Sequence, residues 1–280
     1  MSTSAPGPRV TGLETEFGVL CAPAGPQEAA KADLPDVERA AALIFRHRPV
    51  GYRSTNLFLP NGGRLYLDIG AHPEYATAEC VSVRDLVAQD QAGRVILADM
   101  AKRAAAGLAR EGTEVRFHLL ANNTDSAGHT YGCHESYSVP RSLLDATDDA
   151  SAASSETTMA VLTSFLATRP VLVGSGRPLA GGPTEPNEGG RGAGEDAAWG
   201  LSPRAPHLQA LTSADTTGQR ALVNTRDEPH ADATRLRRLH VTCADTTMAE
   251  PTTGLRSAVT LLLLDALEAG WDFTDLSLTD

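Results

Sequence analysis

The clearest alternation of apolar and polar residues along the chain lies at residues 64–69. Successive side chains of a β-strand point to opposite faces, so this segment predicts a strand with one apolar and one polar face. The apolar face would carry Leu65, Leu67 and Ile69. The polar face would carry Arg64, Tyr66 and Asp68. A second short strand is expected at 56–59, and the intervening turn sequence PNGG predicts that the two strands form a hairpin.

Periodicity predicts further elements on both sides of this hairpin. Strands are expected at residues 10–20, 115–121, 131–139, 221–225 and 239–244, the second and third of them joined by a polar turn. Helices are expected at 34–45, from Ser82 to a stop at Gly112, at 159–168 and at 251–269. Strand pairs interrupted by helices, without regular alternation, predict the α+β class with a mainly antiparallel sheet and packed helices.

One long stretch, residues 174–200, breaks these patterns. It is rich in Gly, Pro and Glu and shows neither helical nor strand periodicity. Such a composition cannot bury much apolar surface, so we expect a mobile insertion at residues 177–198. No internal repeat is visible, and the remainder reads as one domain spanning residues 1–280.

Charge and cysteine content restrict the classes of function. The 280-residue chain has 35 acidic and 24 basic residues and a formal net charge of -11, which argues against a general nucleic-acid surface and against binding to anionic membranes. Its four cysteines form no CxxC pair, so neither a zinc site nor a disulfide framework is indicated. With no secretory signal and no long apolar run, we expect a cytoplasmic protein.

Acidic residues on the first strand suggest a metal site. Glu14 and Glu16 are two residues apart, so both carboxylates would leave one face and repel each other unless a cation lay between them. Two solvated acids on an exposed face are an equally simple interpretation. Glu74 adds a third carboxylate, and oxygen ligands of this kind are those that magnesium prefers beside a phosphate.

Other polar groups leave alternatives open. The polar face of residues 64–69 is either exposed to solvent in an ordinary hairpin or in contact with a charged ligand. Residues 225–232 form either a solvated turn or part of a functional site. Cys133 and His134 are neighbours on a predicted strand, so their side chains point apart and do not form a nucleophile–base pair. The chain has no phosphate-binding loop or dinucleotide fingerprint, so a nucleotide would be held on a sheet face by metals and arginines.

Four long motifs occur in the chain: GLETEFGV, STNLFLPNGGRLYLDIGAHPEYATAEC, NNTDSAGHTYGCHESY and NTRDEPHADATRLRRLHV. Together and in this order they resemble the Pup ligase family, whose members attach the small ubiquitin-like protein Pup to lysines of target proteins and so mark them for the proteasome pathway. The related Pup deamidase/depupylase shares much of this pattern, but LDIGAHPEYATAEC resembles the ligase version.

The resemblance implies a fold similar to glutamine synthetase and other carboxylate–amine ligases, in which a curved antiparallel sheet cradles ATP and magnesium. The magnesium ligands that it implies are Glu14, Tyr66 and Glu74. It further implies contacts of Arg64 and Thr77 with ATP, and Asp68 as the catalytic base. Glu16, His134 and His240 stand where the wider fold places further metal ligands. The implied reaction passes through an acyl phosphate on the carboxyl-terminal glutamate of Pup.

The resemblance ends where a further carboxyl-terminal region of the family would begin. We therefore expect an incomplete catalytic domain that lacks this region. Three hypotheses remain open at this point: an active Pup ligase, a Pup deamidase or depupylase, and an inactive fragment that binds ATP or Pup.

Overall fold

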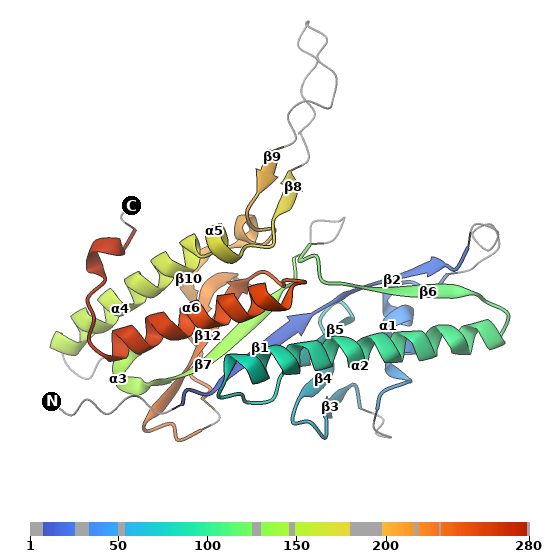
Figure 1. Cartoon of the computed structure of the whole chain (residues 1–280), viewed down its shortest axis with the longest axis horizontal. Helices are drawn as coiled ribbons and strands as arrows, with labels where there is room; N and C mark the ends of the chain where they lie inside the picture. Colours follow the sequence, from blue (N-terminus) through green and yellow to red (C-terminus); the bar gives the residue numbers. More distant parts are fainter. Residues whose placement is uncertain are drawn as a thin grey trace, which may run out of the picture.

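A mainly antiparallel sheet forms the centre of the molecule (Figure 1). The structure is a computed structural model that describes residues 8–25, 34–49, 54–124, 130–145, 149–179, 198–215, 218–229 and 231–278. Within these residues eight strands form the sheet, in the order β10-β11-β12-β7-β1-β5-β4-β3. Their bounds are β1 Thr11–Glu16, β3 Asn56–Phe58, β4 Arg64–Asp68, β5 His72–Ala76, β7 Cys133–Pro140, β10 Ala210–Ser213, β11 Ala221–Asn224 and β12 Leu236–Ala244. Neighbours are antiparallel except β10 and β11.

Two short ribbons lie outside this sheet. Strand β2 (Gly18–Pro23) pairs with β6 (Val115–Leu120), and β8 (Arg177–Leu179) pairs with β9 (Ala198–Gly200). The ends of the expected insertion at 177–198 are therefore strands, and residues 180–197 lie outside the described residues, so its mobility stays a prediction.

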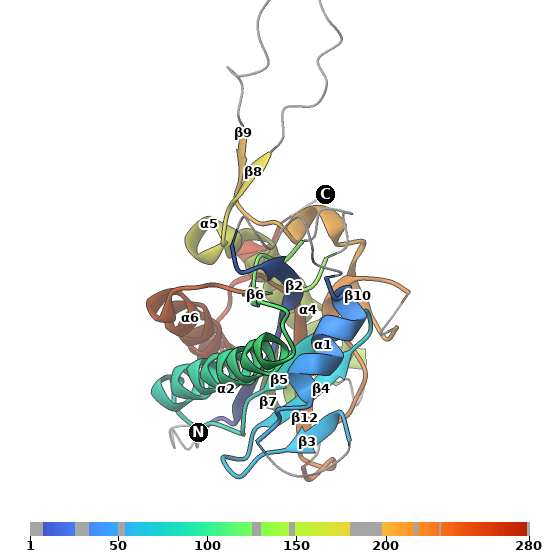
Figure 2. The same cartoon turned by 90° about the vertical axis from the view of Figure 1, so that its right-hand side faces the viewer.

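Helices cover one face of the large sheet (Figure 2). The helices are α1 Val37–Phe45, α2 Val83–Arg110, α3 Arg141–Leu144, α4 Asp149–Thr168, α5 Pro170–Val173 and α6 Glu250–Glu268, with 3-10 turns η1 Ala205–His207 and η2 Thr274–Leu276. Helix α2 lies beside α6 and contacts β1 and β5. One apolar cluster joins α1 and α2 to β2, β4 and β5, and a second joins α4 and α6 to β7, β11 and β12. This arrangement confirms the α+β class.

Local sequence signals explain the position of the longest helix. Ser82 caps α2 by accepting a hydrogen bond from the Asp85 backbone N–H at 3.1 Å, and Gly112 takes a positive φ of 87° just after its end. Gly93 lets the helix approach the sheet, because a Cβ at this position would collide with the ring of Tyr75 on β5. The helix thereby supports the strand that carries Glu74.

Several predicted boundaries are wrong. The expected strand at 10–20 is two strands, because the Phe17 N–H donates to the Pro73 carbonyl at 2.9 Å and the chain then leaves the large sheet to form β2. The strands expected at 115–121 and 131–139 are present as β6 and β7, and they belong to different sheets, since β6 pairs with β2 while β7 pairs with β1. Ile69 lies beyond the end of β4 and is 76% exposed, not on the buried face.

No helix in the described ranges combines the length and the apolar character that crossing a membrane requires.

Candidate functional site

The face of the sheet opposite the helices carries most of the polar residues singled out in the sequence. Cross-strand register aligns them in rows, because directly paired residues share a face. One row is Tyr66, Glu74 and Glu16; the next is Arg64, Ala76, Glu14 and His134; a third pairs Asp68 with His72. The polar face of residues 64–69 therefore continues across β5, β1 and β7.

Glu74 is the most unusual group on this face. Its side chain belongs to a residue only 4% exposed, and its Oε1 accepts a hydrogen bond from the Tyr66 hydroxyl at 2.6 Å. In the described part of the chain, no lysine or arginine forms an ion pair with it. Burial, and then the nearby charge of Glu14, raise the pKa of Glu74 to about 8. Burial and the charge of Glu74 also raise the pKa of Tyr66, so its phenol stays protonated.

Glu14, His134 and His240 form a compact cluster beside Glu74. One potential ligand atom from each residue lies within 4.8 Å of the others. The Glu14 Oε2 atom is 3.2 Å from Nδ1 of His134 and 3.9 Å from Nε2 of His240. Burial alone would raise the pKa of Glu14, but the hydrogen bond and charge of His134 lower it to about 2. Burial and the charge of His134 lower the pKa of His240 to about 4.

Glu16 does not join this cluster. Its Oε1 atom lies 2.6 Å from Nδ1 of His72, and the His72 ring packs at 4.9 Å from the ring of Tyr131. The structure therefore divides the acidic residues of β1 between two partners, with Glu14 facing β7 and β12 and Glu16 facing His72 on β5.

Arg64 and Thr77, the residues expected to contact ATP, differ in the contacts that their side chains make. The Arg64 guanidinium stacks 4.5 Å from the centre of the Tyr66 ring, and its Nε donates to Asn56 Oδ1 at 2.8 Å. Thr77 follows β5, and its Oγ1 accepts the Leu13 backbone N–H at 3.0 Å. Arg64 thus lies within the row of polar groups, whereas Thr77 is tied to the backbone of β1.

A cavity of about 690 Å³ opens on this face. Its wall includes Glu16, Asp68, His72, His134, His240 and Arg204. Asp68 is exposed, so it can reach a ligand from solution. Arg204 was not anticipated, because the surrounding sequence LSPRAP has no recognisable signature. It is only 6% exposed and makes no ion pair with a carboxylate of the residues that the structure describes, so a buried cation without a counter-charge lines the cavity.

Two other sequence candidates have structural roles. Arg226 pairs with Glu228 at 2.5 Å, and Arg238 lies 3.6 Å from the same carboxylate, so this part of the 225–232 motif is an ion network; His230 lies outside the described residues. Cys133 is buried on the helix-facing side and burial raises its pKa to about 11, which confirms that it does not act with His134.

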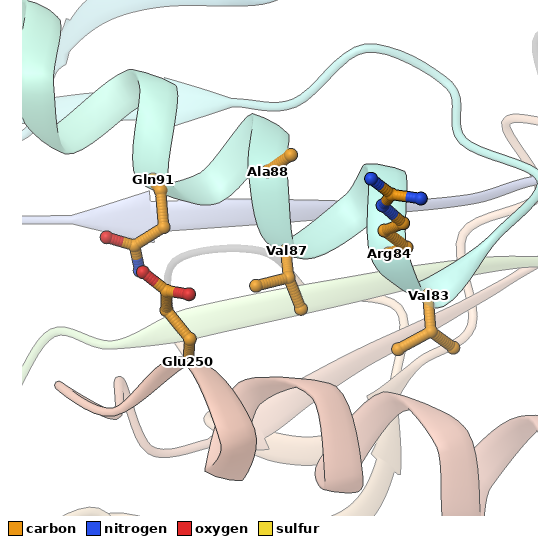
Figure 3. Close-up of a pocket in the computed structure, with 6 residues that line it drawn as sticks. All are labelled: Val83, Arg84, Val87, Ala88, Gln91 and Glu250. Atoms are coloured by element: carbon orange, nitrogen blue, oxygen red, sulfur yellow. The ribbon is translucent and has the colours of Figure 1, made fainter.

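A second cavity, of about 670 Å³, lies between α2 and α6 on the other side of the sheet (Figure 3). Its wall includes the apolar side chains of Val83, Val87 and Ala88, and Gln91 and Glu250 lie next to each other at one end of the cavity (Figure 3). It contains none of the predicted site residues.

Comparisons with known proteins find relatives of nearly the whole chain. The model of the family described as Pup-ligase protein matches residues 9–280. The chain is 45% identical over 270 residues to a Pup–protein ligase of Xylanimonas cellulosilytica and 42% identical over 281 residues to one of Rothia mucilaginosa, each time covering 96% of this chain and 53% of the relative. It therefore spans about half the length of the curated relatives that it matches.

Two solved structures are similar. The crystal structure of the complex between Pup and its ligase PafA aligns with a TM-score of 0.75 and 37% identity, covering 94% of this chain and 47% of the other. The structure of PafA in complex with ADP aligns with a TM-score of 0.62 and 39% identity, covering 85% of this chain and 48% of the other.

Proposed function

The chain belongs to the Pup ligase family, and from this premise we propose that it carries the nucleotide- and metal-binding part of a ligase that joins Pup to lysines of target proteins. A relative with 39% identity has been solved with ADP, and one with 37% identity with Pup. ADP is an anion, and the polar cavity offers the buried Arg204 guanidinium, whereas the cavity between α2 and α6 has Arg84 among mainly apolar residues. The polar cavity therefore suits the nucleotide better. The free cysteines fit a reducing cytoplasm as the place of the reaction.

The observation that carries this proposal is the burial of Glu74 without a basic partner in the described residues. A buried carboxylate that lacks a cation stays protonated, and a divalent ion would ionise it. Glu14, Tyr66 and Glu74 supply hard oxygen donors on adjacent strands, which suits magnesium. Glu14, His134 and His240 offer a mixed oxygen and nitrogen set, which suits a transition metal better.

The proposed reaction has two steps. The γ-phosphoryl group of ATP passes to the side-chain carboxylate of the carboxyl-terminal glutamate of Pup, giving an acyl phosphate and ADP. A target lysine then attacks the acyl carbon and displaces phosphate, forming the isopeptide bond. Magnesium, when bound, offsets the negative charge of the phosphates. Arg64, in the row of Glu14, and Arg204, in the wall of the cavity, add positive charge.

Asp68 is proposed as the base of the second step. A free lysine has a pKa of about 10.4 and is mostly protonated near neutral pH, so it must lose a proton before it can attack. Asp68 is exposed and lines the same cavity as His134 and Glu16. A lysine approaching from solution can therefore reach it without entering the buried cluster around Glu74.

One assay tests the function directly. The purified chain is incubated with ATP, magnesium, Pup ending in glutamate and a lysine-bearing acceptor, and the products are identified by mass spectrometry. ADP together with a new isopeptide supports the ligase. Release of Pup from a preformed conjugate would identify a depupylase instead. If neither product forms but ADP still binds, the chain is a nucleotide-binding module without ligase activity.

A further inference from the structure

Asp245 joins three segments of the chain next to the cavity. It lies directly after β12, is 5% exposed, and accepts hydrogen bonds from two sides. Its Oδ1 accepts from the Ser202 hydroxyl at 2.8 Å and from the Arg204 backbone N–H at 3.3 Å. Its Oδ2 accepts from the Ser175 backbone N–H at 3.1 Å. One carboxylate thus ties both ends of the segment between Ser175 and Arg204 to the end of β12.

Arg204 runs from this junction into the cavity. Its side chain crosses Gly132, the residue before β7, where a Cβ would collide with the Arg204 Cδ. Its Nη2 donates to the Thr242 carbonyl at 2.9 Å and its Nη1 to Thr130 Oγ1 at 3.4 Å. The buried Nε has no hydrogen-bond partner among the described residues. These neutral contacts guide the guanidinium but do not neutralise it, so its position depends strongly on the backbone that carries it.

The backbone of Asp245 is held from the helix-covered face of the sheet. Arg256 of α6 donates through Nη1 to the Asp245 carbonyl, and its Nε lies 2.8 Å from Oε1 of the fully buried Glu135 on β7. The backbone of Asp245 is therefore held by the core, while its carboxylate holds the loop that carries Arg204.

We propose that Asp245 is a positioning residue for the cavity: it sets the backbone of Arg204 so that the guanidinium remains beside His134 and Glu16. The claim about position stands on the contacts above, and its effect on nucleotide binding rests on the proposed function. If Asp245 only supported a loop, its loss would lower stability without acting through Arg204.

The test combines two measurements on four variants: Asp245→Asn, Ser202→Ala, Arg204→Gln and the double variant Asp245→Asn/Arg204→Gln. An asparagine amide has one acceptor oxygen, so it cannot accept on both sides as the carboxylate does. Losing a hydrogen bond of ordinary strength should speed amide exchange at Ser175 or Arg204 by roughly tenfold. Ser202→Ala, which keeps the carboxylate, should give a smaller change in the same direction.

The affinity for ADP in the presence of magnesium, measured by titration calorimetry, shows whether Asp245 acts through Arg204. We expect Asp245→Asn to weaken it by roughly tenfold in the wild-type background and not at all in the Arg204→Gln background, because residues that act through one another are not additive. Equal effects in both backgrounds, or unchanged exchange at both amides, would overturn the proposal. If the wild-type chain binds no ADP, the proposed function fails while the exchange result still decides the position of Arg204.

Asp272→Asn is the matched control. Asp272 also accepts a backbone N–H and a hydroxyl, both from Thr274, at 2.9 and 2.7 Å, but it lies on the exposed carboxyl-terminal segment. This variant should change neither exchange at Arg204 nor ADP affinity.

Discussion

Glu74 and Glu135 are both buried in the central sheet, at 4% and 0% exposure, yet their surroundings differ completely. Glu135 faces the helices, where Arg169 and Arg256 each approach one of its oxygens at 2.8 Å. Burial alone would raise the pKa of Glu135, but the two guanidinium groups hold it below the ordinary value. Glu74 lies on the opposite face of the sheet, with the Tyr66 hydroxyl as its hydrogen-bond partner, and its pKa rises to about 8.

This difference in partners distinguishes a glutamate that holds the fold together from one that is available to bind a ligand. On the helix-facing side the chain supplies its own cations, so Glu135 joins β7 to α6 and to Arg169 between α4 and α5. On the cavity-facing side no such cation faces Glu74 in the described residues, and the carboxylate is suited to an ion from solution. The variants below test each side of this comparison.

Glu135→Gln should have the largest effect. It leaves Arg169 and Arg256 buried without a counter-charge, and breaking a buried pair typically costs about 3–5 kcal/mol. Urea denaturation of the purified chain measures the loss in the free energy of unfolding. A loss no greater than that of Glu74→Gln would show that the two carboxylates do not differ in this way.

Asp68→Asn tests an acid that belongs to neither class, because it is exposed. General-base catalysis typically contributes a factor of about 10²–10⁴ in rate, so isopeptide formation should fall by that amount. The free energy of unfolding should change by less than about 0.5 kcal/mol, and ADP should still bind. Ligation at the wild-type rate would refute the base assignment.

Glu74→Gln should weaken metal binding without weakening the fold. The amide resembles the protonated carboxyl group of the folded, metal-free protein, but it cannot ionise in the unfolded state as the wild-type side chain does. In EDTA at neutral pH, thermal unfolding should therefore move to a higher temperature. Magnesium affinity, measured through its enhancement of ADP binding, should fall by at least about 10–100-fold, the range seen when groups around a metal are lost. Undiminished enhancement would remove Glu74 from the metal site.

Taken per pH unit, the pH dependence of stability provides the smallest effect. In metal-free protein, folded Glu74 keeps its proton up to about pH 8, whereas the unfolded side chain loses it near pH 4.3. The folded state binds more protons in this window, so stability should fall as pH rises, by at most about 1.4 kcal/mol per pH unit. Urea denaturation in EDTA should show a shallower decline for Glu74→Gln, and magnesium should flatten the wild-type curve. Identical slopes in both proteins would contradict the raised pKa.

Short-range patterns predicted the elements that carry the site, and long-range contacts explain the errors. Alternation placed Arg64, Tyr66 and Asp68 on one face, and the Ser82 cap placed α2. Strand β5 was missed because Pro73 interrupts a short segment without clear alternation, although β5 lies between β1 and β4. The roles of Arg204 and Glu135 depend on partners more than 30 residues away, which no local pattern reveals.

The division of the acidic residues was equally hidden from the sequence. Glu14 and Glu16 share a face, as their spacing predicted, but each has a different histidine partner on a different neighbouring strand. Glu14 is opposite His134, and Glu16 turns to His72. The magnesium, nucleotide and base assignments stay predictions.

Crystals of the chain soaked with ADP and manganese test the central claim most directly, because anomalous scattering locates the ion without reference to a protein model. Manganese accepts the same oxygen ligands as magnesium. The account predicts an anomalous peak bounded by Glu14, Tyr66 and Glu74, on the side of the sheet that carries Arg64. A peak confined to Glu14, His134 and His240, or none near Glu74 with ADP bound, would contradict it.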